Sequence, residues 1–149
     1  MTLRPALSLS LLLALGACAA APGAPAPLDA EAKRFEPPPP SSGALYVYRS
    51  GWFGIIRPLD VGVSGGSQAA LPHNSYLRLE GPPGPLEVNC KVGDKSGQRQ
   101  VEVVAGETRY VEVSMTSGLW GPGCEVAEVP PDQGQAAVRS SRRVMPQSQ

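Results

Sequence analysis

Few side chains in this chain of 149 residues are suited to catalysis or metal binding: it contains one histidine, His73, and three cysteines. A histidine that acts as a general base needs a nucleophile beside it and an acid that orients it. Ser64, Ser67 and Ser75 are near His73 in the sequence, but none lies in a Gly-x-Ser-x-Gly pattern. We therefore interpret His73 as an exposed turn residue and expect no catalytic residues and no enzyme activity; a small periplasmic hydrolase is the alternative.

The N-terminal residues predict export. Arg4 precedes an apolar run over residues 6–15, and this run is too short to cross a bilayer but is typical of a signal peptide. The run ends in Leu15-Gly16-Ala17-Cys18, which is similar to the lipobox of bacterial lipoproteins. That resemblance implies a signal peptide over residues 1–17 and acyl chains, such as palmitate, on Cys18, which would bind the protein to the membrane.

The residue after Cys18 bears on which membrane a lipoprotein would be sorted to. Ala19 stands where an aspartate would resemble an inner-membrane retention signal, so the lipoprotein resemblance implies the periplasmic face of the outer membrane. The alternative is cleavage slightly downstream, within Ala19-Ala20-Ala21, which would give a secreted binding domain without lipid.

Both ends of the chain differ in composition from its middle. Residues 18–42 are rich in alanine and proline, which predicts a disordered tether between the lipid and the domain. Residues 131–149 form a basic tail that is either solvated or in contact with anionic lipid or a polyanionic envelope polymer. Asp132 could cap a short helix there. Thirteen basic and 13 acidic residues cancel over the whole chain, so we expect no nucleic-acid partner.

Residues 43–130 alternate between apolar and polar side chains with a period of two, which is typical of half-buried strands. Glycine- and proline-rich turns separate these segments, as at 81–84 and 105–106. The pattern predicts an all-β domain, an antiparallel sandwich of about seven to eight short strands similar to immunoglobulin or transthyretin folds.

Two cysteines fall within this domain. Cys90 shares a strand face with Val88 and Val92, and Cys124 begins the last expected strand. Both are expected to point inward in an oxidising compartment, so we predict a disulfide between them, with two unpaired thiols as the alternative. One histidine and two paired cysteines cannot form a zinc site, so we expect no metal and no cofactor.

Both tryptophans lie in glycine-flanked loops, 50–56 and 117–121. Exposed aromatic side chains mark contact surfaces, so we consider a binding patch for a partner protein, glycan or lipid. In the alternative interpretation the indoles plug the open end of the sandwich. The patch would consist of Trp52, Phe53 and Trp120, with Arg49 and Arg57 beside it to orient an anionic ligand.

The order of several landmarks resembles one family of bacterial lipoproteins, catalogued as domain of unknown function 2846. The landmarks are residues 43–49 (Gly-Ala-Leu-Tyr-Val-Tyr-Arg), 60–65 (Asp-Val-Gly-Val-Ser-Gly), 74–77 with 82–84, and 104–111 (Val-Ala-Gly-Glu-Thr-Arg-Tyr-Val). The resemblance covers roughly residues 43–130 and implies a β-sandwich lipoprotein of the cell envelope, without catalytic residues. We therefore expect a non-catalytic interaction or structural module whose partner is an envelope protein or glycan.

Overall fold

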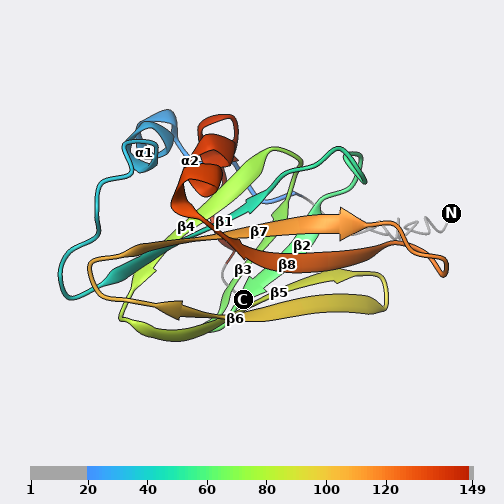
Figure 1. Cartoon of the computed structure of the whole chain (residues 1–149). Helices are drawn as coiled ribbons and strands as arrows, with labels where there is room; N and C mark the ends of the chain where they lie inside the picture. The colour runs from blue at the N-terminus through green and yellow to red at the C-terminus, as the bar shows by residue number, and fades with distance from the viewer. Residues whose placement is uncertain (1–19, 148–149) are drawn as a thin grey trace, which may run out of the picture.

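The computed structural model describes residues 20–147, so the predicted signal peptide and Cys18 lie outside the described residues (Figure 1). The described residues form two helices and nine strands. In chain order these are α1 (Ala26–Ala32), β1 (Gly43–Arg49), β2 (Leu59–Val63), β3 (Ser67–Leu71), β4 (Ser75–Gly81), β5 (Gly84–Val92), β6 (Lys95–Val103), β7 (Thr108–Thr116), β8 (Gly123–Val129), α2 (Pro131–Arg139) and β9 (Arg142–Arg143). Within residues 20–147, neither helix has the length and apolar character needed to cross a membrane.

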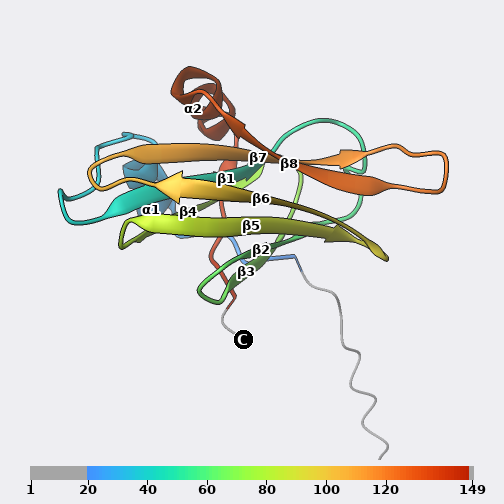
Figure 2. The ribbon, with the colours of Figure 1, turned by 60° about the horizontal axis from the view of Figure 1, so that its bottom comes forward.

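The strands form two stacked sheets, which confirms the predicted all-β sandwich with a short C-terminal helix (Figure 2). One sheet has the strand order β8-β7-β1-β4-β9 and the other has the order β3-β2-β5-β6. Pairing is antiparallel except that β1 pairs in parallel with β7, and β4 with β9. The β1–β7 exception arises because the β6–β7 turn returns the chain to the end where β1 begins, so both strands run the same way; there Ala44 N donates to Glu107 O at 3.0 Å.

The main core lies between the sheets and consists of inward-facing aliphatic side chains such as Val47, Val88 and Val111. The predicted disulfide between Cys90 and Cys124 is present and joins β5 to β8 across the two sheets. The bond closes a sequence separation of 34 residues, and a loop of this length contributes about 3–4 kcal/mol in the chain-entropy model. Gly97 pairs with Cys90, and a Cβ on it would lie 2.6 Å from Cys124 O, so only glycine permits this close approach.

A second core covers the outer face of the five-stranded sheet. The helices α1 and α2 lie over the outer face of this sheet (Figure 1). Four tyrosines on β1, β4 and β7 are buried beneath them; they are Tyr46, Tyr48, Tyr76 and Tyr110. The prediction that β1 has only one buried face was therefore wrong, because every residue of β1 is buried. Gly134 of α2 lies directly on the Tyr110 ring, where a Cβ would come within 2.3 Å. This glycine is what lets the helix pack closely on the sheet.

The prediction of a disordered tether over residues 18–42 was wrong for the described part, residues 20–42. The side chains of Ala21 and Ala32 are buried, so even this alanine-rich segment contributes to the hydrophobic cores. Ala21 N donates to Ala70 O on β3 at 3.0 Å, and Ala24 N donates to Arg143 O on β9 at 2.9 Å. Backbone pairing thus supplies the stabilisation that the sparse apolar side chains do not.

The basic tail is also ordered as far as residue 147. Beyond α2, Arg142 and Arg143 add strand β9 to the edge of β4, and Gln147 N donates to Gln68 O of β3 at 2.7 Å. The N-terminal segment and the tail also bond each other, since Met145 N donates to Pro22 O at 2.9 Å. The two ends of the described chain therefore hold one another against the sandwich.

Asp29 fastens α1 to the sheet. Its carboxylate accepts hydrogen bonds from Tyr76 Oη, from the backbone N of Arg143 and from Lys33 Nζ, each at 2.8 Å. Burial alone would raise the pKa of Asp29, but these three hydrogen bonds outweigh it and hold the pKa below its ordinary value of 3.8.

The substitution Asp29→Asn should remove this attachment, and the resulting loss of stability should depend on pH. Because the folded pKa is depressed, the unfolded chain binds more protons, so the stabilisation is complete above about pH 5 and is lost as the pH falls through the folded pKa. Melting temperatures should show the variant less stable than the wild type at neutral pH, with a difference that shrinks in acid. Asp94→Asn, in an exposed turn, is the control. A difference that stays constant into acid would contradict the role of the carboxylate.

Candidate interaction surface at one end of the sandwich

Arg49 is the last residue of β1, and its side chain is fully buried, with 0% exposure. Its Nη1 donates to Arg57 O at 2.6 Å and to Leu71 O at 2.8 Å, and its Nη2 donates to Gly54 O at 2.6 Å. Burial lowers the pKa of this guanidinium, and backbone carbonyl dipoles, not a carboxylate, face its charge. The prediction that Arg49 orients an anionic ligand was therefore wrong: it organises the loop from inside.

The loop held by Arg49 connects β1 to β2 over residues 50–58. Ser50 Oγ donates to the Glu112 carboxylate at the loop base, and Gly54 packs on the thioether of Met115, where any Cβ would clash. Gly54 also has a positive φ of 71°, which a larger residue would adopt only with strain. With its backbone drawn inward, the loop directs its apolar side chains outward: Trp52 is 82% exposed and Ile56 is 92% exposed.

A second loop, between β7 and β8 over residues 117–122, lies at the same end of the sandwich (Figures 1 and 2). It follows Met115 and Thr116, so it begins beside the point where Gly54 rests on β7. Lys95 Nζ reaches across from the β5–β6 hairpin and donates to Gly121 O at 3.1 Å. Leu119 and Trp120 at the loop tip are 91% and 87% exposed.

Every large hydrophobic side chain that is exposed within residues 20–147 belongs to these two loops. We call this set the apolar end; it comprises Trp52, Phe53, Ile55, Ile56, Leu119 and Trp120. The interpretation of the tryptophans as plugs of the sandwich was wrong, because both indoles face solvent. Ile55, Ile56 and Leu119 were not among the residues predicted for this patch, although apolar residues without alternation inside a glycine-flanked loop are a signal for such exposure. Arg57 is exposed in the same loop.

The imidazole of His73 makes no hydrogen bond through its buried Nδ1 to any described residue. His73 is half-buried in the β3–β4 turn, not exposed as predicted, and lies beside a hollow of about 440 Å³ that Ala21, Ser140 and Arg142 also line. Ser75 Oγ donates to Pro72 O at 2.7 Å, so its hydroxyl proton is committed to the backbone. Across residues 20–147, no three His, Cys, Asp or Glu side chains come together in a way that could hold a metal ion.

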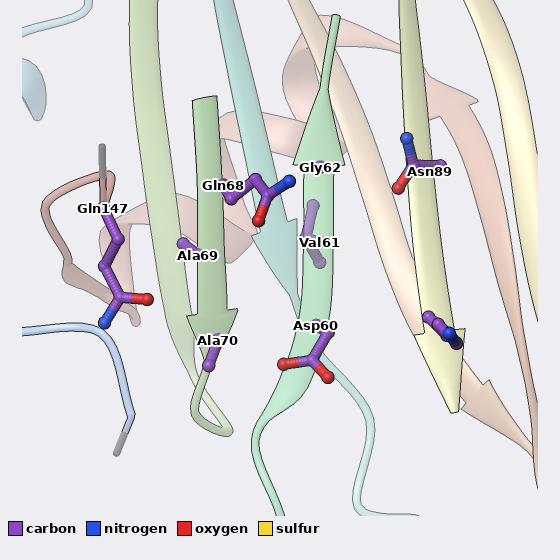
Figure 3. A pocket seen from close by; sticks show the side chains of 9 residues that line it. Asp60, Val61, Gly62, Gln68, Ala69, Ala70, Asn89 and Gln147 are labelled. Carbon is purple, nitrogen blue, oxygen red and sulfur yellow. The ribbon is translucent and has the colours of Figure 1, made fainter. Parts of the chain in front are cut away.

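The outer face of the four-stranded sheet is hollowed by about 290 Å³ (Figure 3). Gly62 forms its floor between the side chains of Gln68 and Asn89, while Asp60 and Lys91 lie opposite each other on β2 and β5. A Cβ at Gly62 would meet Asn89 Oδ1 at 2.8 Å, so the glycine keeps this hollow open. The lining is amide-rich and shallow, which suits hydrogen bonding to a polar ligand.

Comparison with known proteins identifies no relative: no protein-family model matches the chain, and neither a curated protein nor a solved structure matches it.

Arg49→Met should destabilise the protein although it replaces a charge with an apolar group of similar length. The carbonyls of Gly54, Arg57 and Leu71 would lose their donor, which we expect to lower the free energy of unfolding by about 3 kcal/mol. Urea unfolding would measure the loss, and hydrogen exchange at the Arg57 amide, which donates to Gly54 O at 3.2 Å, should accelerate. Arg57→Met, on an exposed side chain, is the control; equal stability of the two variants would refute the organising role of Arg49.

Trp52→Ala and Trp120→Ala should leave stability nearly unchanged, within about 0.5 kcal/mol, because both indoles are exposed. Tyr46→Ala, which empties a buried site in the second core, should cost about 4 kcal/mol in the same urea titration. A large loss at either tryptophan would mean that the loops are packed core and not a contact surface.

Proposed function

We propose that the protein is a lipid-anchored lipoprotein of the periplasmic face of the outer membrane and serves the cell envelope as a non-catalytic interaction or structural module. The observation that carries the proposal is the disulfide between Cys90 and Cys124. Disulfides of this kind form and persist in oxidising compartments outside the cytosol. Export is what an N-terminal signal peptide would provide.

The disulfide also supports a separate role for the third cysteine, Cys18. It accounts for two of the three cysteines in the sequence, and the third, Cys18, directly follows the apolar run in the lipobox-like Leu15-Gly16-Ala17-Cys18. A cysteine in that position has a chemical role in lipoproteins that a buried structural cysteine lacks. Lipidation of Cys18 therefore explains the sequence around it.

The role as an interaction module is supported by the apolar end. Large hydrophobic side chains gathered in two adjacent loops are costly to expose, and such patches on soluble domains mark surfaces that contact a partner or a membrane.

Intact mass of the protein from its producing bacterium tests the proposal. We expect a chain that begins at Cys18 and carries added acyl mass, and that gains two alkyl groups only after reduction. Cys18→Ser is the control, since it should abolish the acyl mass and leave the disulfide intact. A wild-type chain that starts beyond Cys18 without acyl groups would contradict the lipoprotein proposal and indicate a secreted domain.

A further inference from the structure

We propose that the apolar end inserts into the membrane interface beside the lipid anchor, so that the domain rests on the bilayer. This inference rests on the proposed lipidation of Cys18, but it concerns a different part of the molecule: the two exposed loops of the folded domain. Its basis is where the described chain begins and what surrounds that point.

The N-terminal segment is fixed close to the loop that Arg49 holds. Ala21 is buried and donates its N–H to Ala70 O, and the next carbonyl on β3, that of Leu71, accepts from Arg49 Nη1. The same guanidinium holds Gly54, at the centre of the β1–β2 loop. Hydrogen bonds to two consecutive residues of β3 therefore connect the start of the described chain to one half of the apolar end.

The reach of the chain before this point is short. Cys18 precedes Ala21 by three residues, and three residues span at most about 10 Å even when fully extended. Ala21 also lines the hollow beside Pro72 and His73, in the turn that leads to β4, and the first residue of β4, Ser75, pairs with Arg49. Lipid on Cys18 would thus enter the bilayer near the end of the sandwich that carries the apolar loops.

The composition of the apolar end suits a bilayer interface. Tryptophan concentrates at the boundary between lipid headgroups and acyl chains, and isoleucine and leucine gain from transfer into the apolar region. Arg57 is exposed beside the loops and Lys95 reaches the β7–β8 loop, so cations can meet anionic headgroups, with Asp94 on the adjacent hairpin as a nearby opposing charge.

The opposite end of the sandwich offers a contrast. The turns there consist of small residues and prolines, at 64–66, 81–84 and 105–106. No large hydrophobic side chain that the structure describes is exposed in them. Apolar exposure is therefore confined to the end from which the chain leads back to Cys18, which favours the membrane over an unrelated partner as the occupant.

The two tryptophans of the chain are both in the apolar end and serve as built-in probes. Mature protein, its acyl mass verified first, is reconstituted in vesicles of phosphatidylethanolamine and phosphatidylglycerol with brominated phosphatidylcholine. Trp52→Phe and Trp120→Phe isolate each indole. The matched control combines both substitutions with Ala105→Trp, which places the only indole in an exposed turn at the opposite end.

We expect bromine near the headgroups to quench Trp52 and Trp120 at least about twofold, as for interfacial indoles, and to leave the control at residue 105 unquenched. Acylated protein with unquenched loop tryptophans would overturn this inference while leaving the anchor in place. Blue-shifted emission without quenching would also overturn it and would indicate a protein partner or a second copy on the apolar end. Absence of acyl mass would instead refute the proposed lipoprotein function.

Discussion

The guanidinium of Arg49 has no access to solvent, and three backbone carbonyls surround it where water or a carboxylate would otherwise stabilise its charge. Two of these carbonyls belong to the β1–β2 loop and the third ends β3 in the other sheet. The same charge therefore joins the two sheets at one end and fixes the loop that exposes Trp52. Ala21 attaches to β3 next to that junction, so the position of the first described residues relative to the apolar end depends on it.

The sandwich was predictable because apolar and polar residues alternate along its strands, and this alternation can be read from the local sequence alone. The inward placement of Cys90 and Cys124 followed from the same periodicity. The tether could not be judged in this way: Ala21 and Ala32 bury little area each, and their order comes from backbone hydrogen bonds to β3 and β9 and from the Asp29 carboxylate. These hydrogen-bond partners are distant in sequence, so the local composition of the segment does not reveal them.

The candidate site was predictable in part. Exposure of Trp52 and Trp120 agreed with the interpretation of the glycine-flanked loops as a contact surface, whereas Arg49 looked like a surface cation because it closes a strand. The sequence does not show that Arg49 is buried without a carboxylate partner. Its burial depends on the carbonyls of Gly54, Arg57 and Leu71, which only the fold brings together around it. The tyrosines of β1 were similarly ambiguous, since their burial needs two helices from opposite ends of the chain.

With the lipid that we propose on Cys18, order from residue 20 onward would place the domain in direct contact with the membrane and not at the end of a long tether. Neutron reflectometry of the mature protein in a supported bilayer tests that placement most directly. The account predicts a protein layer that adjoins the headgroups without an intervening layer of solvent. A hydrated gap of about 20 Å or more between headgroups and protein, as a tether in an extended polyproline conformation would produce, would contradict it.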